Sequence, residues 1–447
     1  MSEVASRVSE RHEGVPPRVV VVYDGASINP MVLNEAASGV CRIVWVVDGA
    51  DPVVAPLVRL LRRIGDVVDQ SGADVDAMTS ALALHAPAGI ITFSEARMLL
   101  TAALAEQLSL TYHSVPTASR LADKYLQRLA LREAGLPGPG VWKAPPTNLG
   151  EDEFAAAVEA LAESVTFPVV VKPRRGTGSV ATARADDGRQ LSDLLSRFGG
   201  QEGGLLIEEY LADRESGSPF ADDVAVELLA QGGRVWHLAT TGKFAHAPPF
   251  RSRGCFLPSH VDPSTEAELF GAAEAAVRAV GITDGFANVD VKLTPDGPRI
   301  VEVNGRLGGN VDVLMELAGG PAILPLVFRA ALGYDMAADR EVERILGGSW
   351  RRIGYFAWIQ TPMAATRLVG VEGLDEVATL SHVSSVVRNQ RQGDALDWAV
   401  GGRFNVSEVF GSVENLSDLA AARDEIDDTV ELDFEKAPQG ITTTGAE

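Results

Sequence analysis

The segment that most constrains this chain runs from Phe286 to Gly309 and reads FANVDVKLTPDGPRIVEVNGRLGG. Apolar and polar residues alternate on either side of a Pro-Asp-Gly-Pro turn, which predicts two short strands joined by a hairpin. Strand side chains alternate with a period of two, so we expect Asp290, Glu302 and Asn304 on one side of neighbouring strands. Two carboxylates and an amide oxygen are ligands that Mg²⁺ takes when it also keeps water and phosphate oxygens. The segment therefore predicts a metal site that serves a nucleotide.

The surroundings of these oxygens bear on whether the hairpin is a binding site or an ordinary solvent-facing turn. Acidic residues on an exposed hairpin face are common, and this is the alternative interpretation. The carboxylates lie within Val- and Ile-rich strands that read as buried, where an unpaired charge is costly. Arg306 follows, and Gly308 with Gly309 would let the backbone approach a bound group closely. These features favour a binding site.

A second segment, Phe167 to Ala183 (FPVVVKPRRGTGSVATA), has the features of a phosphate-binding loop. A β-prone run carries Lys172, and the loop after it contributes glycines and hydroxyls at positions 176–179. Such a loop exposes backbone N–H groups that can wrap phosphate oxygens. It is not the Walker pattern, because no G-x-x-x-x-G-K-[ST] leads into a helix. A glycine-rich hairpin alone is a weak signal, and the preceding lysine and the distant acid and amide set strengthen it.

A third segment, Leu205 to Leu211 (LLIEEYL), is an apolar strand that ends in two glutamates. Its backbone N–H and C=O groups could pair with the edge of an adenine ring. An ordinary edge strand with a charged end is the alternative interpretation of this segment alone.

Taken in order, these motifs resemble the ATP-grasp superfamily, and within it the carboxylate–amine ligases that include the L-amino acid (dipeptide) ligases of the bacilysin synthetase kind. The resemblance covers roughly residues 18–330. It implies an α/β (α+β ATP-grasp) fold with a parallel N-terminal α/β domain, a mobile lid subdomain and a larger catalytic subdomain built on an antiparallel sheet. The hairpin departs slightly from the family, which more often has Glu at the position of Asp290.

The resemblance also implies a role for each motif residue. Arg306 would be catalytic and would stabilise an acyl-phosphate and the tetrahedral intermediate that follows it. The implied ATP-binding residues, with adenine at 209–211 and ribose at Asp223, are Lys124, Lys172, Gly176, Thr177, Gly178, Ser179, Glu208, Glu209, Tyr210, Leu211 and Asp223. The implied ligands of Mg²⁺, with Mn²⁺ as an alternative ion, are Asp290, Glu302 and Asn304.

The segment Lys243 to Pro258 (KFAHAPPFRSRGCFLP) departs from the family more strongly. Dipeptide ligases often carry E-x-G-H-x-x-P here, whereas this chain has the hydroxyl of Ser252 and the thiol of Cys255, with Arg251 and Arg253 close by. An arginine fork suits a carboxylate or phosphate, so we expect a substrate with an extra anionic group, such as a glutamyl side chain. The alternative is that both arginines are solvated loop residues. The expected substrate contacts are Arg251, Ser252, Arg253, Cys255, Gly308 and Gly309.

Length and composition fit a multidomain intracellular enzyme. The chain has 447 residues, a formal net charge of −22 and two cysteines in unrelated segments, so neither a disulfide framework nor a nucleic-acid binder is indicated. No long apolar run and no apolar leader appear, so we expect a cytoplasmic protein without a membrane partner. The expected divisions are a disordered tail at 1–16, an N-terminal domain at 17–118, linker helices and lid at 119–213, a catalytic subdomain at 214–350, a C-terminal α/β appendage at 351–436 and a tail at 437–447.

The activity implied by the resemblance is an ADP-forming ligase that joins small-molecule carboxylate and amine substrates through an acyl-phosphate, in a homodimer that serves specialised metabolism. Three alternatives stay open. The amine could belong to a carrier protein, or the acid could be bicarbonate or another small acid, as in biotin carboxylase and purine-pathway relatives. A degenerate ATP-binding protein without activity is the third, and the presence of the lysines, metal ligands and Arg306 argues against it.

Overall fold

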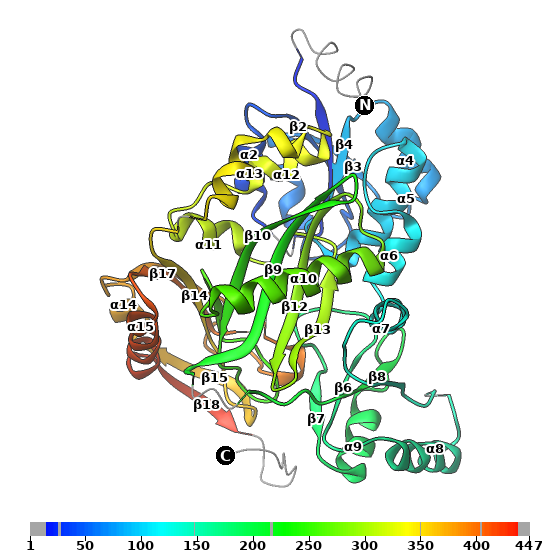
Figure 1. The fold of residues 1–447 in the computed structure, drawn as a ribbon, viewed down its shortest axis with the longest axis vertical. Coiled ribbons are helices and arrows are strands. Elements are labelled where there is room, and N and C mark those ends of the chain that lie inside the picture. Colours follow the sequence, from blue (N-terminus) through cyan, green and yellow to red (C-terminus); the bar gives the residue numbers. More distant parts are fainter. Residues whose placement is uncertain are drawn as a thin grey trace.

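The computed structural model describes residues 15–25, 28–146, 148–214, 218–348, 350–402 and 405–436. Nearly all of the tail expected at 1–16, and all of that expected at 437–447, therefore lie outside the described residues. The N-terminal domain and the lid lie at opposite ends of the molecule, with a large sheet between them (Figure 1). Within the described residues no helix is long and apolar enough to cross a membrane.

The N-terminal domain is built on a parallel sheet with strand order β3-β2-β1-β4. Its strands are almost continuous runs of buried Val and Ile, the pattern of a parallel sheet covered on both faces. The strands are β1 (Arg18–Val22), β2 (Arg42–Val47), β3 (Asp66–Asp69) and β4 (Gly89–Ile91), and the helices are α2 (Pro30–Ala37), α3 (Val58–Ile64), α4 (Val75–Ala83) and α5 (Met98–Leu108), with short 3-10 turns at η1 (Ala55–Leu57) and η2 (Glu95–Arg97).

Two short helices lead from this domain into the lid. We expect a single helix over residues 119–134 from the sequence, but the structure has α6 (Val115–Leu121) and α7 (Lys124–Glu133). Asp123 separates them, because its carboxylate accepts the N–H groups of Tyr125 and Leu126 and so caps α7. Lys124 is consequently the first residue of a new helix.

The lid is a small antiparallel sheet with order β5-β8-β6-β7 and two helices. Its elements are β5 (Val141–Lys143), α8 (Glu151–Ser164), β6 (Val169–Pro173), β7 (Ala183–Ala185), α9 (Gly188–Phe198) and β8 (Leu205–Glu209). The phosphate loop, defined here as Gly176–Ser179, connects β6 to β7 at the side that faces the large sheet.

The large sheet is antiparallel, and its order in the described chain is β13-β12-β9-β10-β11-β14-β17-β16. Successive residues of β9 serve both faces: Val226 and Leu228 pack against helix α10, whereas Leu229 packs toward the N-terminal domain. The elements before residue 350 are β9 (Phe220–Gln231), β10 (Arg234–Phe244), β11 (Gly254–Leu257), α10 (Pro263–Val280), β12 (Gly285–Thr294), β13 (Gly297–Asn304), α11 (Val311–Leu317), α12 (Leu324–Ala331), η3 (Met336–Ala338) and α13 (Arg340–Leu346).

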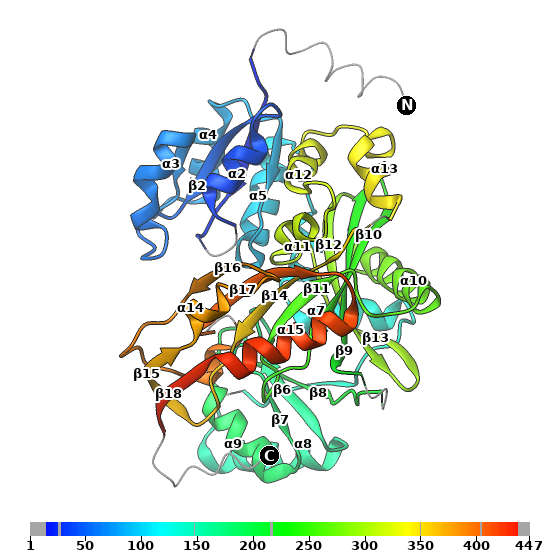
Figure 2. The ribbon, with the colours of Figure 1, turned by 90° about the vertical axis from the view of Figure 1, so that its left-hand side faces the viewer.

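The C-terminal part continues this sheet, so the sheet crosses the domain boundary expected at residue 350. Strand β14 pairs with β11 and β17, whereas β15 and β18 form a separate two-stranded ribbon. Figure 2 shows helix α15 crossing this part of the molecule. The elements are β14 (Ile353–Ile359), β15 (Ala365–Glu372), α14 (Leu374–Val377), β16 (Val383–Arg388), η4 (Trp398–Val400), β17 (Ser407–Val413), α15 (Leu416–Thr429) and β18 (Glu431–Lys436). The expected fold class is confirmed.

Candidate functional site

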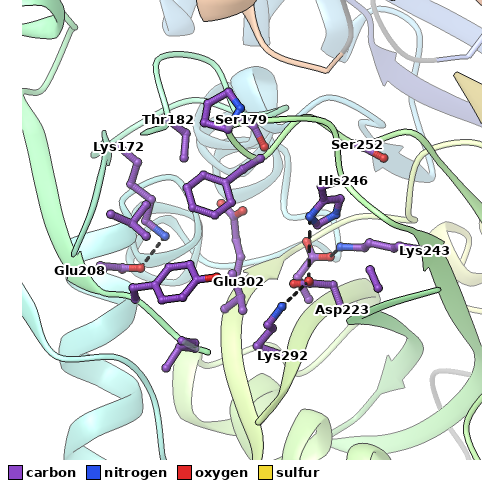
Figure 3. A pocket seen from close by; sticks show the side chains of 18 of the residues that line it. Lys172, Ser179, Thr182, Glu208, Asp223, Lys243, His246, Ser252, Lys292 and Glu302 are labelled. Carbon is purple, nitrogen blue, oxygen red and sulfur yellow. Dashed lines mark hydrogen bonds and ion pairs between the residues drawn. The ribbon is translucent and has the colours of Figure 1, made fainter. Parts of the chain in front are cut away.

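A cavity of about 620 Å³ lies between the lid and the large sheet. Figure 3 shows its charged side chains in two groups on opposite sides, with Glu302 between them. The cavity brings together most of the residues that the sequence singles out: Lys124, Lys172, Gly176, Thr177, Gly178, Ser179, Glu208, Glu209, Tyr210, Leu211, Asp223, Ser252, Asp290 and Glu302.

The first group surrounds Glu208, at the end of lid strand β8. Its carboxylate accepts from Arg128 of α7 at 2.8 Å and lies 2.6 Å from the ammonium of Lys172. Burial works against the charge on Glu208, but the two cations outweigh it and lower the pKa of its carboxyl. Burial lowers the pKa of Lys172, and the neighbouring Arg128 adds to this effect. Lys172 therefore has a carboxylate and a second cation as neighbours, and an incoming polyanion would stabilise its charged form.

Lys124 links the helix start, the phosphate loop and the hairpin. Its ammonium donates to the carbonyl of Gly176 at 2.5 Å and lies 2.7 Å from the Glu302 carboxylate. Burial opposes its charge, but Glu302 and Glu95 more than compensate and raise the pKa of Lys124. A phosphate group at the loop would thus meet a lysine whose charged form is favoured.

The expected metal ligands lie on neighbouring strands. Asp290 of β12 is the cross-strand partner of Glu302 in β13, and Asn288 is the partner of Asn304. Both carboxylates face the cavity, whereas Asn304 is not among its described lining residues and donates to Asn288 at 3.2 Å. No group of three or more His, Cys, Asp or Glu side chains suited to a metal occurs in the described chain. Two carboxylates that line this cavity nevertheless fit a Mg²⁺ ion, which draws further ligands from phosphate and water.

Each of these carboxylates is held by a lysine. Lys243 of β10 lies 2.5 Å from Asp290, and Lys124 holds Glu302. Sequence reasoning missed Lys243, because nothing in its local pattern separates it from other strand lysines.

The second charged group surrounds Asp223 on β9. Lys292 lies 2.8 Å from its carboxylate, and His246 lies 4.0 Å away. Burial works against the charge on Asp223, but His246 and Lys292 lower the pKa of its carboxyl. The sequence carried a signal for Lys292. It lies two residues after Asp290 in the same strand, so the two side chains share one face. His246 carried no such signal.

The segment expected to hold adenine also lines the cavity. The carboxylate of Glu209 accepts the backbone N–H of Gly140 at 3.0 Å, so this side chain braces the lid. The ring of Tyr210 lies under the guanidinium of Arg184, 4.5 Å from its centroid, and 6.3 Å from the ring of Phe250. An aromatic wall of this kind suits a planar base.

The arginines expected to contact a substrate have partners within the chain. Arg251 is 2% exposed and donates to the carbonyls of Pro248 and Thr361, and Arg253 forms an ion pair with Asp427. The described lining residues of the cavity do not include Arg251, Arg253 or Cys255. Burial raises the pKa of the Cys255 thiol to about 12, so it stays protonated near neutral pH.

Arg306 lies beside a second, smaller cavity of about 220 Å³, between the N-terminal domain and the large sheet, and Gly308 is not among the described lining residues of that cavity. The Arg306 guanidinium donates to the carbonyl of Leu307 at 3.1 Å and lies 3.5 Å from the Glu95 carboxylate. Gly308 donates its backbone N–H to Glu227 at 3.0 Å. Gly309 is not among the described lining residues of either cavity.

Glu227 is a further residue that sequence reasoning missed. It is fully buried on β9, and it also accepts from the side-chain amide of Asn288 at 2.5 Å. Asn288 in turn holds Asn304, so Glu227 connects the glycine turn after Arg306 to the metal hairpin. A lone Glu in an apolar run (VAVELL) was a detectable signal, because buried carboxylates need partners.

Comparison with known proteins agrees with this arrangement. Residues 121–310 match the family model of the ATP-grasp domain. The chain is 29% identical over 264 residues to human carnosine synthase 1, a match that covers 54% of this chain and 30% of that protein. It is 21% identical over 344 residues to an L-arginine-specific L-amino acid ligase of Bacillus subtilis, covering 74% of this chain and 76% of the relative.

Among solved structures, an L-amino acid ligase from Bacillus licheniformis superposes with a TM-score of 0.72 at 20% identity, covering 95% of this chain and 100% of the other. At this identity the likeness shows the fold alone. This chain spans less than a third of the length of human carnosine synthase 1. The resemblance to the ATP-grasp superfamily is confirmed for the domain at 121–310.

Proposed function

From the premise that residues 121–310 form an ATP-grasp domain, we propose that this chain is an ADP-forming ligase that joins a carboxylate to an amine. The observation that carries the proposal is the cavity itself. There Lys124, Lys172 and the phosphate loop line the same cavity as the paired carboxylates Asp290 and Glu302. One cavity thus holds both cations that neutralise a triphosphate and oxygen ligands for a divalent ion.

ATP would bind with its adenine beside 209–211 and its phosphates beneath the loop Gly176–Ser179. Lys124 and Lys172 would neutralise the phosphates, and Asp223 would accept from the ribose hydroxyls. Asp290 and Glu302 would hold Mg²⁺, with Asn304 as the third expected ligand and Mn²⁺ as an alternative ion. When bound, the ion would offset phosphate charge and fix the γ-phosphate geometry.

The chemistry begins with two anions. A substrate carboxylate oxygen attacks the γ-phosphorus, its new P–O bond replaces the bond to ADP, and an acyl-phosphate results. The lysines lower the repulsion between carboxylate and triphosphate. A neutral amine then attacks the acyl carbon, the bond from that carbon to the phosphate oxygen breaks, and the amine loses a proton as the amide forms. Arg306 would stabilise the oxyanion, and Cys255 takes no part because its thiol is protonated.

The substrates are amino-acid-like in this proposal, and a role in specialised metabolism goes with it. Similarity to a carnosine synthase and to an L-amino acid ligase supports amino-acid substrates. The arginines no longer support a substrate with an extra anionic group, because Arg251 and Arg253 already have partners within the chain. A carrier-bound amine is the second candidate, and a homodimer is the proposed assembly.

The test is Mg²⁺-dependent ADP release by the purified chain, with the proteinogenic amino acids supplied singly and in pairs. We expect release with particular pairs, a ligated product by mass spectrometry, and loss of both in the Glu302→Gln variant. Glu316→Gln is the control, because Glu316 is an exposed acid on nearby helix α11. ATP binding without turnover on any pair would reject the free-amino-acid proposal and favour a carrier-bound amine.

A further inference from the structure

A short stretch of the C-terminal part, Asp397 to Gly402, lies directly against the phosphate loop of the lid. We call these residues the docking segment. The N–H of Gly402 donates to the carbonyl of Gly178 at 3.0 Å, and the N–H of Ala181 donates to the carbonyl of Ala399 at 2.7 Å. The two backbone bonds bracket the end of the phosphate loop. Its position is therefore set by the C-terminal part as well as by the lid.

Gly401 shows how close this approach is. Its φ of +84° is one that side-chain-bearing residues rarely adopt, and a Cβ there would lie 2.1 Å from the carbonyl oxygen of Gly178. Any side chain at 401 would force the docking segment and the phosphate loop apart.

Trp398 anchors the same segment in the lid. It is 9% exposed and belongs to the lid's apolar core together with Val169, Val171 and Phe198. Its ring lies 6.0 Å from that of Phe198 in an edge-on arrangement, and Arg197 stacks over it at 4.7 Å. The contact is thus a packed interface between the two parts.

Gln360, just after β14, extends the connection to the other side of the cavity. Its amide nitrogen donates to the carbonyl of Gly402 at 2.8 Å and to the carbonyl of Ser252 at 2.8 Å. A primary amide has two N–H hydrogens, so one side chain serves both acceptors. Its oxygen lies 3.5 Å from the Arg251 guanidinium. The segment 247–252, here called the substrate loop, is closed by paired backbone bonds between Ala247 and Arg251.

We propose that Gln360 is a positioning residue that couples the phosphate loop to the substrate loop through Gly402 of the docking segment. The inference rests on the proposed function for its purpose. When a nucleotide orders the phosphate loop, the two hydrogen bonds of Gln360 would also order the substrate loop, whose Ser252 lines the cavity. Both loops would then be ordered together before the acyl-phosphate forms, which limits its loss to water.

Hydrogen exchange of the two loops tests this coupling without any substrate. In the chain without nucleotide, Gln360→Ala should speed exchange at both 176–181 and 247–252, by about five- to tenfold for the loss of one hydrogen bond at each. Gln390→Ala is the matched control, a half-buried glutamine of the same part of the chain. Gln360→Glu keeps the side-chain shape but removes both donors, and it should behave like Gln360→Ala. Faster exchange at one loop alone, or at neither, would overturn the coupling.

A second pair of variants tests the docking segment. Gly401→Ala should speed exchange at 176–181, whereas Gly393→Ala should not, although Gly393 has a similar φ of +93° and open space around its Cβ position. Equal effects of the two changes would mean that backbone strain, not docking, is responsible, and would overturn the assignment.

A nucleotide arm separates this inference from the proposed function. A non-hydrolysable ATP analogue with Mg²⁺ should protect both loops in the natural chain and only the phosphate loop in Gln360→Ala. Protection of the phosphate loop alone in the natural chain would refute the coupling and leave the ligase proposal standing. No protection anywhere would refute the nucleotide site itself, while the arms without nucleotide would still report whether the two loops are joined.

Discussion

The buried carboxylate of Glu227 holds the backbone of Gly308, accepting its N–H at 3.0 Å. The bond crosses from the middle of β9 to the turn after Arg306, and its other oxygen is bound by Asn288. Burial raises the pKa of Glu227 to about 7, because the loss of hydration outweighs the two hydrogen bonds. One buried acid thus fixes the glycine turn and the hairpin, and its charge changes near neutral pH.

Replacing Glu227 by Gln should change how stability depends on pH. The folded pKa lies above the ordinary value of 4.5, so between those values the folded chain keeps a proton that the unfolded chain has lost. Stability of the natural chain therefore falls as pH rises through this window, and the variant lacks that loss. We expect Glu227→Gln to gain about 2–3 kcal/mol relative to the natural chain between pH 5 and pH 8. Urea unfolding at each pH measures it, and a pH-independent difference would show that Glu227 titrates normally.

Arg128 should matter for the stability of the folded chain. It bonds Glu208, and both side chains are almost fully buried. Arg128→Met leaves Glu208 with only one cation, and we expect a loss of about 3 kcal/mol in the free energy of unfolding. Arg388→Met is the control, since Arg388 pairs with a 94% exposed Asp375 and should cost less than about 1 kcal/mol. Equal losses would refute the buried network as a stabilising feature.

Lys172→Met should weaken binding of ATP without unfolding the lid. The ammonium lies in the cavity among Glu208 and the phosphate loop, and its loss removes a charge that would face the phosphates. We expect about a hundredfold weaker binding, judged by calorimetry, for a charge-assisted contact in a partly closed site. Lys143→Met, an exposed lysine of the same lid, should bind ATP as the natural chain does. Unchanged affinity in Lys172→Met would remove this lysine from the nucleotide site.

ADP release should depend on a divalent metal ion held by the carboxylates of the β12–β13 hairpin. Chelation with EDTA should abolish ADP release, and Mg²⁺ should restore it. Glu302→Gln should lower the rate by about 10²-fold or more, since it removes one carboxylate ligand and the partner of Lys124. Metal titrations at fixed ATP check this, with a raised Mg²⁺ requirement expected in the variant. A variant with the natural metal requirement would exclude Glu302 as a ligand.

Local pattern was enough to predict the hairpin, the loop between β6 and β7, and the strand that carries Glu208. Each of these features is encoded within one short stretch, by the pattern of apolar residues or by turn residues and glycines. Recognising them therefore needs no knowledge of distant contacts. Asp290 and Glu302 were expected on one face, and the register makes them cross-strand partners. The parallel N-terminal layer and the antiparallel catalytic layer were expected from the family resemblance, and the structure has both.

What the sequence could not supply are contacts between distant segments. Arg251 reads as a free cation in a loop, yet it is buried against Thr361, a residue far along the chain. Lys243 contacts Asp290 and Gln360 contacts Ser252, and in both pairs the two residues lie far apart in the sequence. The break between α6 and α7 shows the same limit at short range, because Asp123 could cap a new helix or continue an old one.

The most direct test of the central claim follows the carboxylate oxygen through the reaction. An accepted acid substrate labelled with ¹⁸O in its carboxylate is incubated with the chain, ATP, Mg²⁺ and the amine, and the released phosphate is analysed by mass spectrometry. An acyl-phosphate route transfers one labelled oxygen to each phosphate and leaves the other in the amide. Product formation with unlabelled phosphate would contradict the account, because the carboxylate would then not have attacked the γ-phosphorus.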